Sequence, residues 1–319
     1  MSKPLLQKPL PPNANSVAVC VLALCTLCVL TLSSCATTQQ QAPQSDAPPA
    51  KSATGASYIP ERFDWQPICA GADYAVHEAR NPSVRYHCVK INLNAATIAI
   101  TAYPASKADF IAGAEEASHT FIGKRTADFA KESGATIALN GAPFSGNASS
   151  VFSLLTSKRK TIGTHILQQQ ELGNPTSRYG ALVLQQHEHG FYASIIDQQT
   201  EALLTNATFA FGGFWTILRN DETLSFAAIR TARTACGIAD NGTTLYLLAV
   251  EGKRKSVGLS YAECAAIFKA LHCDCAMEFD GGGSTELCIN GKSVISYRVT
   301  RKNGVSWGFT FKDNIFIDH

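Results

Sequence analysis

The hexapeptide Asp280–Thr285, DGGGST, combines one acid, three glycines and two hydroxyl side chains. Consecutive glycines remove the Cβ atoms beside the acid, so the backbone can adopt positive φ values and approach a ligand closely. Free N–H groups in such a loop can face an anion. The Asp280 carboxylate could act as acid or base, accept a sugar hydroxyl, or bind a divalent cation. A plain glycine-rich turn is the equal alternative, because Asp-Gly is itself a strong turn signal.

Three arginines, Arg230, Arg233 and Arg301, are candidate phosphate ligands. The guanidinium group has a planar fork that matches phosphate oxygens, and it stays charged at any relevant pH. Most single arginines are solvated surface residues. Arg233 stands apart from them because it opens the stretch RTACG, just before an apolar run that begins at Thr243.

The elements that must position these residues follow from hydrophobic periodicity. Thr243–Val250 is continuously apolar and predicts a buried strand. Ser260 with Glu263 three residues later forms a capping box, and the apolar spacing that follows predicts a helix to Leu271. Cys275–Phe279 predicts the strand that leads directly into the glycine loop.

The same reasoning predicts further elements along the chain. Asn290-Gly291 suits a type I′ turn, so a hairpin is expected there. The expected helix is 121–131, and the expected strands are two within 84–103, then 135–139, 179–184, 190–196, two within 207–218 separated by a glycine bend, 287–289, 294–297 and 307–311. Asn140-Gly141 and Asp280-Gly281 each follow a helix and a short strand. This likeness suggests two similar units that face each other across a cleft, where loops commonly carry function.

These elements predict an α+β fold with mixed, mainly antiparallel sheets and a few packed helices in one domain, residues 59–319. Residues 1–35 read as an export signal, with two lysines, an apolar stretch and the ending LSSC, which is typical of a bacterial lipoprotein site with Cys35 as the lipidated residue. An uncleaved membrane anchor or a conventional signal is the alternative. Residues 36–58 are polar and predict a disordered tether.

The charge and the cysteine content of the chain limit which ligands and which disulfides can be expected. Two of the 27 basic residues precede Cys35, so 25 basic and 25 acidic side chains follow it, and no net basic field is present to attract nucleic acid. Seven cysteines follow Cys35, an odd number, so at least one is free. Cys69 and Cys88 are the pair expected to form a disulfide in an exported protein. Cys273 and Cys275 form a C-x-C without a second such pair, which favours structural cysteines over a metal site.

Several short motifs occur in a specific order: Asn140–Phe144 (NGAPF), Arg233–Gly237 (RTACG), Leu245–Lys253 (LYLLAVEGK), Gly258–Ser260 (GLS) and Asp280–Ser284 (DGGGS). Together they resemble the phosphodiester glycosidase family, which contains the lysosomal uncovering enzyme and many bacterial exported proteins. The resemblance covers most of residues 84–312 and is strongest over residues 233–284. Pro143 and Cys236 depart from the residue types expected at their positions.

The resemblance implies an exported hydrolase that cleaves the glycosidic bond of a sugar-1-phosphodiester in a glycan or envelope polymer. Carried onto this chain, it implies charge stabilisation by Arg233 and a carboxylate role for Asp280, with Glu278 two residues earlier on the same strand face. The residues implied in substrate binding are Asn140, Gly141, Gly281, Gly282, Gly283, Ser284, Thr285 and Arg301. No cofactor is required, and a divalent cation near Asp280 is the open option.

Two other functions fit the same residues. A surface lipoprotein could bind a phosphorylated glycan in this cleft without cutting it. A serine hydrolase could use Ser284, although the chain has no Gly-x-Ser-x-Gly elbow there and no histidine in the matching motifs. The expected location is outside the cell, lipid-anchored to a bacterial membrane through Cys35.

Overall fold

A computed structural model describes residues 58–104, 120–145, 148–151, 155–157, 160–162, 179–197, 204 and 206–312. The export signal, the lipidated Cys35 and nearly all of the tether predicted for residues 36–58 lie outside these residues and remain predictions. The described residues all belong to one structural unit, Ala53–His319.

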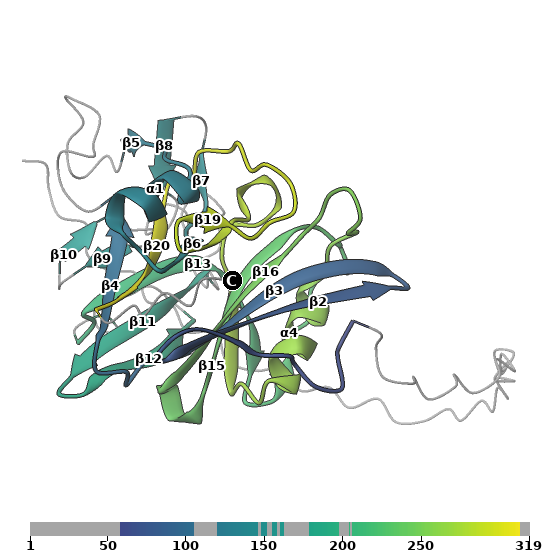
Figure 1. Cartoon of the computed structure of the whole chain (residues 1–319), viewed down its shortest axis with the longest axis horizontal. Helices are drawn as coiled ribbons and strands as arrows, with labels where there is room; N and C mark the ends of the chain where they lie inside the picture. The colour runs from purple at the N-terminus through teal and green to yellow at the C-terminus, as the bar shows by residue number, and fades with distance from the viewer. Residues whose placement is uncertain are drawn as a thin grey trace, which may run out of the picture. The chain divides into compact units, whose positions relative to one another are not determined.

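The largest sheet has twelve strands and is antiparallel (Figure 1). Nine strands follow the order β1-β2-β3-β16-β15-β17-β13-β11-β12. Of the other three, β9 and β14 pair with β13, and β10 pairs with β9. Its strands are β1 (Gln66–Cys69), β2 (Ala72–Arg80), β3 (Ser83–Asn92), β9 (Leu155–Ser157), β10 (Lys160–Ile162), β11 (Tyr179–His187), β12 (Gly190–Ile196), β13 (Phe209–Arg219), β14 (Glu222–Thr223), β15 (Arg233–Ala239), β16 (Thr244–Val250) and β17 (Cys275–Glu278).

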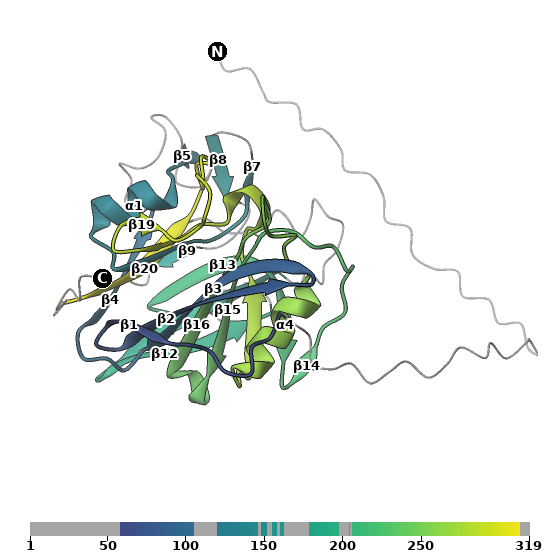
Figure 2. The same ribbon diagram turned by 45° about the vertical axis from the view of Figure 1, so that its right-hand side comes forward.

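A five-stranded sheet has the order β19-β18-β6-β20-β4, and a three-stranded sheet has the order β5-β8-β7. Their strands are β4 (Ile98–Tyr103), β5 (Thr120–Ile122), β6 (Ile137–Asn140), β7 (Phe144–Ser145), β8 (Ala148–Val151), β18 (Leu287–Ile289), β19 (Lys292–Ser293) and β20 (Ser306–Phe311). The helix α1 (Thr126–Ser133) lies beside β6 and β18, and α4 (Tyr261–Ala270) lies against β13 and β17. Figure 2 shows α1 beside β19 and β20 of the five-stranded sheet.

Strand β16 shows how the layers are filled. Leu245 and Leu247 face the core between the large sheet and the five-stranded sheet, whereas Leu248 and Val250 face the core under α4. Successive side chains of a strand point to opposite faces. Because both faces of this strand are covered, its sequence is continuously apolar instead of alternating, as the sequence predicted.

The helix predicted from Ser260 is confirmed with its capping box. The Ser260 hydroxyl accepts from the Glu263 N–H (3.3 Å), and the Glu263 carboxylate accepts from the Ser260 N–H (2.8 Å). Two backbone donors that the first helical turn leaves unpaired are thereby satisfied. Cys264 and Phe268 lie on the buried face of this helix, so Cys264 acts as a small apolar side chain.

Other expectations need correction. The predicted helix at 121–131 begins only at Thr126, because Thr120–Ile122 pairs with β8, a partner far along the chain. The region 207–218 is one strand, β13, whose register shifts at its glycines instead of breaking. The hairpin turn has the expected positive φ at Asn290 and Gly291, but its second strand is β19, not 294–297. Strands β1 and β2 were not anticipated.

The expected Cys69–Cys88 disulfide is wrong, because all seven cysteines after Cys35 are free. Cys69 packs against the core between the sheets, whereas Cys88 belongs to the core under α4. The two thiols therefore face opposite sides of the large sheet, and no bridge can join them without moving the backbone.

The prediction of mainly antiparallel sheets is confirmed, since every strand pairing in the described ranges is antiparallel. The α+β class is correct only roughly, because α1 and α4 are short elements on a mainly β scaffold. In the same ranges, no helix combines the length and the apolar character that crossing a membrane requires.

Candidate functional site

The glycine loop starts where β17 ends, and β17 is a central strand of the large sheet. A Cβ at Gly281 would lie 2.8 Å from the Ala232 carbonyl oxygen, so this glycine is needed for close backbone packing. The Gly282 N–H donates to the same oxygen (2.8 Å). Gly282 has a φ of +59°, and nothing lies within 4 Å of the position its Cβ would take. The loop is therefore fixed on its inner side and open on its outer side, as a ligand-binding loop needs.

Asp280 is partly buried at the start of this loop. Burial raises the pKa of its carboxyl group to about 6. The Ser284 hydroxyl, the Arg301 guanidinium and the Gly281 N–H act in the opposite direction, because each stabilises the ionised form. The group is therefore mostly ionised at neutral pH and close enough to its pKa to exchange a proton.

Asn140 lies under the loop instead of lining a ligand site. Its Oδ1 accepts from the Thr234 hydroxyl (2.9 Å) and the Glu286 N–H (3.0 Å), and its Nδ2 donates to the Asp280 carbonyl (2.6 Å). The side chain is fully buried. Gly141 is also packed inside, where a Cβ would lie 2.9 Å from Val305. These contacts make Asn140 a positioning residue for the loop.

The two motifs with internal likeness meet directly. The Asp280 N–H donates to the Gly141 carbonyl (3.0 Å), opposite in direction to the bond from Asn140. The loops therefore join the five-stranded sheet to the large sheet, and the expectation that they face each other across a cleft is wrong at this point. The physical reason is that both strand ends leave backbone donors and acceptors that must be paired when buried.

Ser284 and Thr285 close the loop and are both buried. The Ser284 carbonyl accepts from the Asn303 side chain (3.0 Å), which also donates to the Thr126 hydroxyl (3.0 Å). The Thr285 hydroxyl oxygen is buried with no hydrogen-bond partner among the described residues. No local pattern in the sequence distinguishes Asn303 from any other loop asparagine, because its partners Thr126 and Ser284 are distant in the chain.

Arg301 is exposed beside the loop. Its guanidinium lies 4.9 Å from the centre of the Phe144 ring, and its Cδ lies 3.6 Å from the position that a Cβ at Gly283 would take. A cation held over an aromatic face is oriented without being neutralised. Arg301 thus places a positive charge where an anion above the glycine loop could reach it.

Arg233 and Glu278 form a second, buried polar environment under α4. The Arg233 Nε donates to the Leu259 carbonyl (3.0 Å), a terminal nitrogen donates to the Ile229 carbonyl (2.6 Å), and the guanidinium stacks on the Tyr261 ring (3.9 Å). Burial raises the pKa of Glu278 to about 8, although Arg233 and the Cys264 thiol act to lower it. Glu278 is 1% exposed, and a pKa of about 8 keeps its carboxyl group mostly protonated at neutral pH.

The two candidate carboxyl groups are therefore in different surroundings. Asp280 lies beyond the end of β17, so the two-residue strand spacing from Glu278 does not place both groups on one face. None of the groups that shift the pKa of one carboxyl is the other carboxyl. Asp280 and Arg301 reach solvent at the loop, whereas Arg233 is buried and bonded to two backbone carbonyls. Both carboxyl oxygens of Glu278 are buried with no hydrogen-bond partner among the described residues.

Arg230, the third candidate phosphate ligand, is engaged elsewhere. Its Nε lies 3.0 Å from both oxygens of Glu263, the glutamate of the capping box. This two-point pair occupies the guanidinium fork with a carboxylate of its own chain.

Glu251 is a buried carboxylate whose only sequence signal is its place in the motif Leu245–Lys253. It accepts from the Ser296 N–H (2.8 Å) and hydroxyl and from His87 (3.0 Å), and it lies 3.3 Å from Arg85. These hydrogen bonds hold the pKa of Glu251 below its usual value despite burial. The His87 ring is bonded in turn to the Tyr74 hydroxyl (2.7 Å).

The sequence leaves open a divalent cation at Asp280. No group of three or more histidine, cysteine, aspartate and glutamate side chains has the arrangement of a metal site within the described part of the chain. The side chains that influence the Asp280 carboxyl are a hydroxyl and a guanidinium. The cation near Asp280 stays a prediction.

The sequence profile of a family described as phosphodiester glycosidase matches residues 133–310. No curated protein matches the chain. The catalytic domain of zebrafish N-acetylglucosamine-1-phosphodiester alpha-N-acetylglucosaminidase, auto-inhibited by its pro-peptide, superposes with a TM-score of 0.56 at 16% identity, covering 76% of this chain and 83% of that one.

Two bacterial structures are also similar. A hypothetical protein from Synechocystis gives a TM-score of 0.55 at 14% identity, and a protein of Burkholderia pseudomallei K96243 gives 0.51 at 12% identity. They cover 76% and 71% of this chain, which in turn spans 62% of the Synechocystis chain and 74% of the Burkholderia chain. At these identities the structural likeness establishes the fold alone.

Proposed function

Because the chain belongs to the phosphodiester glycosidase family, we propose that it hydrolyses the glycosidic bond of a sugar-1-phosphodiester, with the scissile phosphate above the glycine loop. The observation that carries the proposal is the environment of the Asp280 carboxyl group. Asp280 is partly exposed at an open loop, and its carboxyl group is mostly ionised at neutral pH because the Ser284 hydroxyl and the Arg301 charge stabilise the ionised form against burial.

Each group at the loop has a distinct role in this proposal. A phosphodiester carries one negative charge, which Arg301 meets with its exposed guanidinium. As the glycosidic bond breaks, the sugar gains positive character and the phosphate gains charge. The Asp280 carboxylate stabilises the sugar or directs water, and Arg301 stabilises the departing phosphate. Gly282 and Gly283 let the substrate approach the backbone.

Arg233 and Glu278 act through position, because neither reaches the loop surface. Arg233 fixes the carbonyls of Ile229 and Leu259 next to the start of β15. Glu278 lies at the end of β17, two residues before Asp280, and stays neutral at pH 7. Arg233 thereby supports a strand end next to the loop, whereas the Glu278 carboxyl oxygens are buried without a hydrogen-bond partner among the described residues. Substitution of either residue should disturb the loop geometry.

Location and substrate complete the proposal. A glycan or envelope polymer outside the cell is the substrate class, and N-acetylglucosamine 1-phosphodiesters are the first compounds to test because the zebrafish enzyme is named for them. Lipidation at Cys35 and a polar tether over residues 36–58 would hold the domain at a membrane.

The deciding experiment follows the purified full chain with N-acetylglucosamine 1-(methyl phosphate) in water labelled with ¹⁸O. Glycosidic cleavage places the label in the sugar, whereas attack at phosphorus places it in the phosphate. Asp280→Asn should reduce the rate by at least about 100-fold, since it keeps the shape and removes the charge. Asp274→Asn is the matched control, because Asp274 is an exposed aspartate just before β17 begins.

Label in the phosphate would overturn the glycosidase proposal. Equal losses in the two variants would remove Asp280 from the site. Tight binding of sugar 1-phosphodiesters without any turnover would identify a phosphoglycan-binding protein instead. Covalent labelling of Ser284 by a serine-reactive phosphonate would favour the hydrolase alternative.

A further inference from the structure

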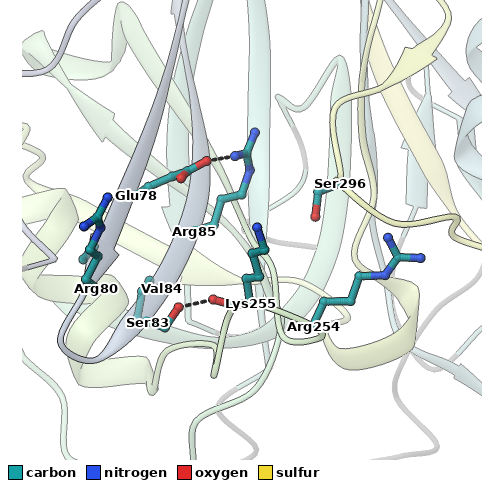
Figure 3. Close-up of a pocket in the computed structure, with 9 residues that line it drawn as sticks. Glu78, Arg80, Ser83, Val84, Arg85, Arg254, Lys255 and Ser296 are labelled. Atoms are coloured by element: carbon teal, nitrogen blue, oxygen red, sulfur yellow. Dashed lines mark hydrogen bonds and ion pairs between the residues drawn. The ribbon is translucent and has the colours of Figure 1, made fainter.

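A groove of about 650 Å³ lies between the turn of the β2–β3 hairpin and the loop that follows β16 (Figure 3). The hairpin contributes Glu78, Arg80 and Arg85, and the loop contributes Arg254 and Lys255. Its full lining is Glu78, Ala79, Arg80, Ser83, Val84, Arg85, Arg254, Lys255 and Ser296.

The loop is fastened to the hairpin by several hydrogen bonds. The Ser83 hydroxyl donates to the Lys255 carbonyl, and the Val257 N–H donates to the Ser83 carbonyl (2.9 Å). Ser256 is buried between them, where its hydroxyl donates to the Glu251 carbonyl and accepts from the Arg85 N–H (3.2 Å). The backbone that carries Arg254 and Lys255 is thus held against the hairpin, so the groove is built into the fold.

The groove has an excess of positive charge, whereas the residues after Cys35 include equal numbers of basic and acidic side chains. It holds four cationic side chains and one acid. Arg85 pairs with Glu78 and with the buried Glu251. Arg80, Arg254 and Lys255 are exposed, and no ion pair involves them within the described ranges. Three cations on neighbouring backbone segments raise each other's free energy unless an anion is shared between them.

The groove is connected to the Asp280 loop through short contacts. Ser296, in the groove lining, donates to Glu251. A Cβ at Gly252, which follows Glu251, would lie 2.3 Å from the Ala232 N, and the Ala232 carbonyl accepts from Gly282. Strand β15 lies between β16 and β17, and its start is next to the ends of both. The groove and the Asp280 loop therefore lie at the same end of these three neighbouring strands.

We propose that this groove binds a second anionic group of the substrate, a phosphate or phosphodiester on the part of the polymer that leaves with the scissile phosphate. The inference rests on the proposed function, because it extends the same site. One phosphodiester has one charge, for which Arg301 is sufficient. The charges of Arg80, Arg254 and Lys255 suit a repeating, multiply charged chain, and the preferred substrate is then a polymer with several phosphates.

Binding is tested with the purified full chain and inorganic tripolyphosphate by calorimetry at fixed ionic strength. The double variant Arg254→Gln/Lys255→Gln should bind about 10-fold or more weakly than the parent, because two charge-assisted contacts are lost. Arg62→Gln/Lys292→Gln is the matched control. It removes one arginine and one lysine that are exposed and lie outside the groove, and it should change the dissociation constant less than about twofold.

Turnover is tested with two sugar 1-phosphodiesters that differ only in the leaving side, one with a methyl group and one with a chain carrying two further phosphates. The parent should prefer the charged compound in kcat/KM, and the groove double variant should lose about 10-fold of that preference, mainly through KM. The control double variant should retain it.

The outcomes separate the two proposals. Tripolyphosphate that binds the parent and Asp280→Asn equally, but not the groove variant, supports the groove even if no turnover is found. A protein that cleaves the methyl compound but shows no groove-dependent tripolyphosphate binding overturns the groove and keeps the glycosidase. Inorganic phosphate competing as well as tripolyphosphate also overturns it, since the site would then read single phosphates only.

Discussion

Asn140 and Asp280 are joined by a hydrogen bond of 2.6 Å from the Asn140 Nδ2 to the Asp280 carbonyl. The bond links β6 of the five-stranded sheet to the loop after β17 of the large sheet. A second hydrogen bond runs in the opposite direction, from the Asp280 N–H to the Gly141 carbonyl (3.0 Å). The position of the Asp280 carboxylate therefore depends on how the two sheets pack, and not on its loop alone.

Asn140→Ala should lower both stability and activity. It removes the partners of the Asp280 carbonyl, the Glu286 N–H and the Thr234 hydroxyl, and each buried polar group left unpaired costs about 1–3 kcal/mol. Thr234→Val removes only one of these contacts and should cost less. Urea unfolding followed by circular dichroism measures both. Equal stability of the parent and Asn140→Ala would show that the amide does not hold the loop.

The stability of Glu278→Gln relative to the parent should increase as the pH rises. The folded pKa of about 8 lies above the unfolded value of 4.5, so the unfolded chain loses this proton first and the free energy of unfolding falls between pH 4.5 and 8. A glutamine has no proton to lose. The difference in Tm between Glu278→Gln and the parent should therefore move in favour of the variant from pH 5 to pH 9.

The exposed Glu222 provides the control for this measurement. Glu222→Gln should follow the parent at each pH, because its side chain is solvated in both states. A Tm difference for Glu278→Gln that stays constant from pH 5 to pH 9 would show that the Glu278 carboxyl ionises normally.

The activity should rise with pH through about 6, as the Asp280 carboxyl loses its proton. Arg301→Gln should move this rise to higher pH, because the Arg301 charge lowers the pKa of Asp280. It should also raise KM if the guanidinium holds the phosphate. The pH dependence of kcat/KM reports the first effect. An unchanged acid limb in Arg301→Gln would separate the arginine from the Asp280 carboxylate.

Two alanine substitutions in the loop should behave differently. At Gly281 a Cβ would lie 2.8 Å from the Ala232 carbonyl, so Gly281→Ala should shift the backbone and cost about 1–3 kcal/mol together with most of the activity. At Gly283 the Arg301 Cδ, at 3.6 Å, is an ordinary contact. Gly283→Ala should stay within about 0.5 kcal/mol of the parent by thermal unfolding. Equal effects of the two substitutions would contradict the described packing of the loop.

The elements whose signals are local could be predicted from the sequence. The capping box at Ser260 and the apolar run of β16 identify their helix and strand because the responsible contacts lie within a few residues or follow a strict period. The glycine loop and its aspartate are visible for the same reason, since three glycines beside an acid specify an unusual local backbone. The order of several such motifs was sufficient to point to the family.

Other features depend on residues that are distant in the chain. Strand β5 reads as part of a helix because its partner, β8, lies more than twenty residues away, and the two cysteines expected to bridge are separated by the faces of a sheet that the sequence does not display. The role of Asn140 as a cross-link, the burial of Arg233 and Glu278, and the meeting of the hairpin with residues 254–255 arise only when the strands are ordered. Propensity and spacing act over one element, whereas burial, pKa and electrostatic surroundings are set by the neighbours that tertiary packing supplies.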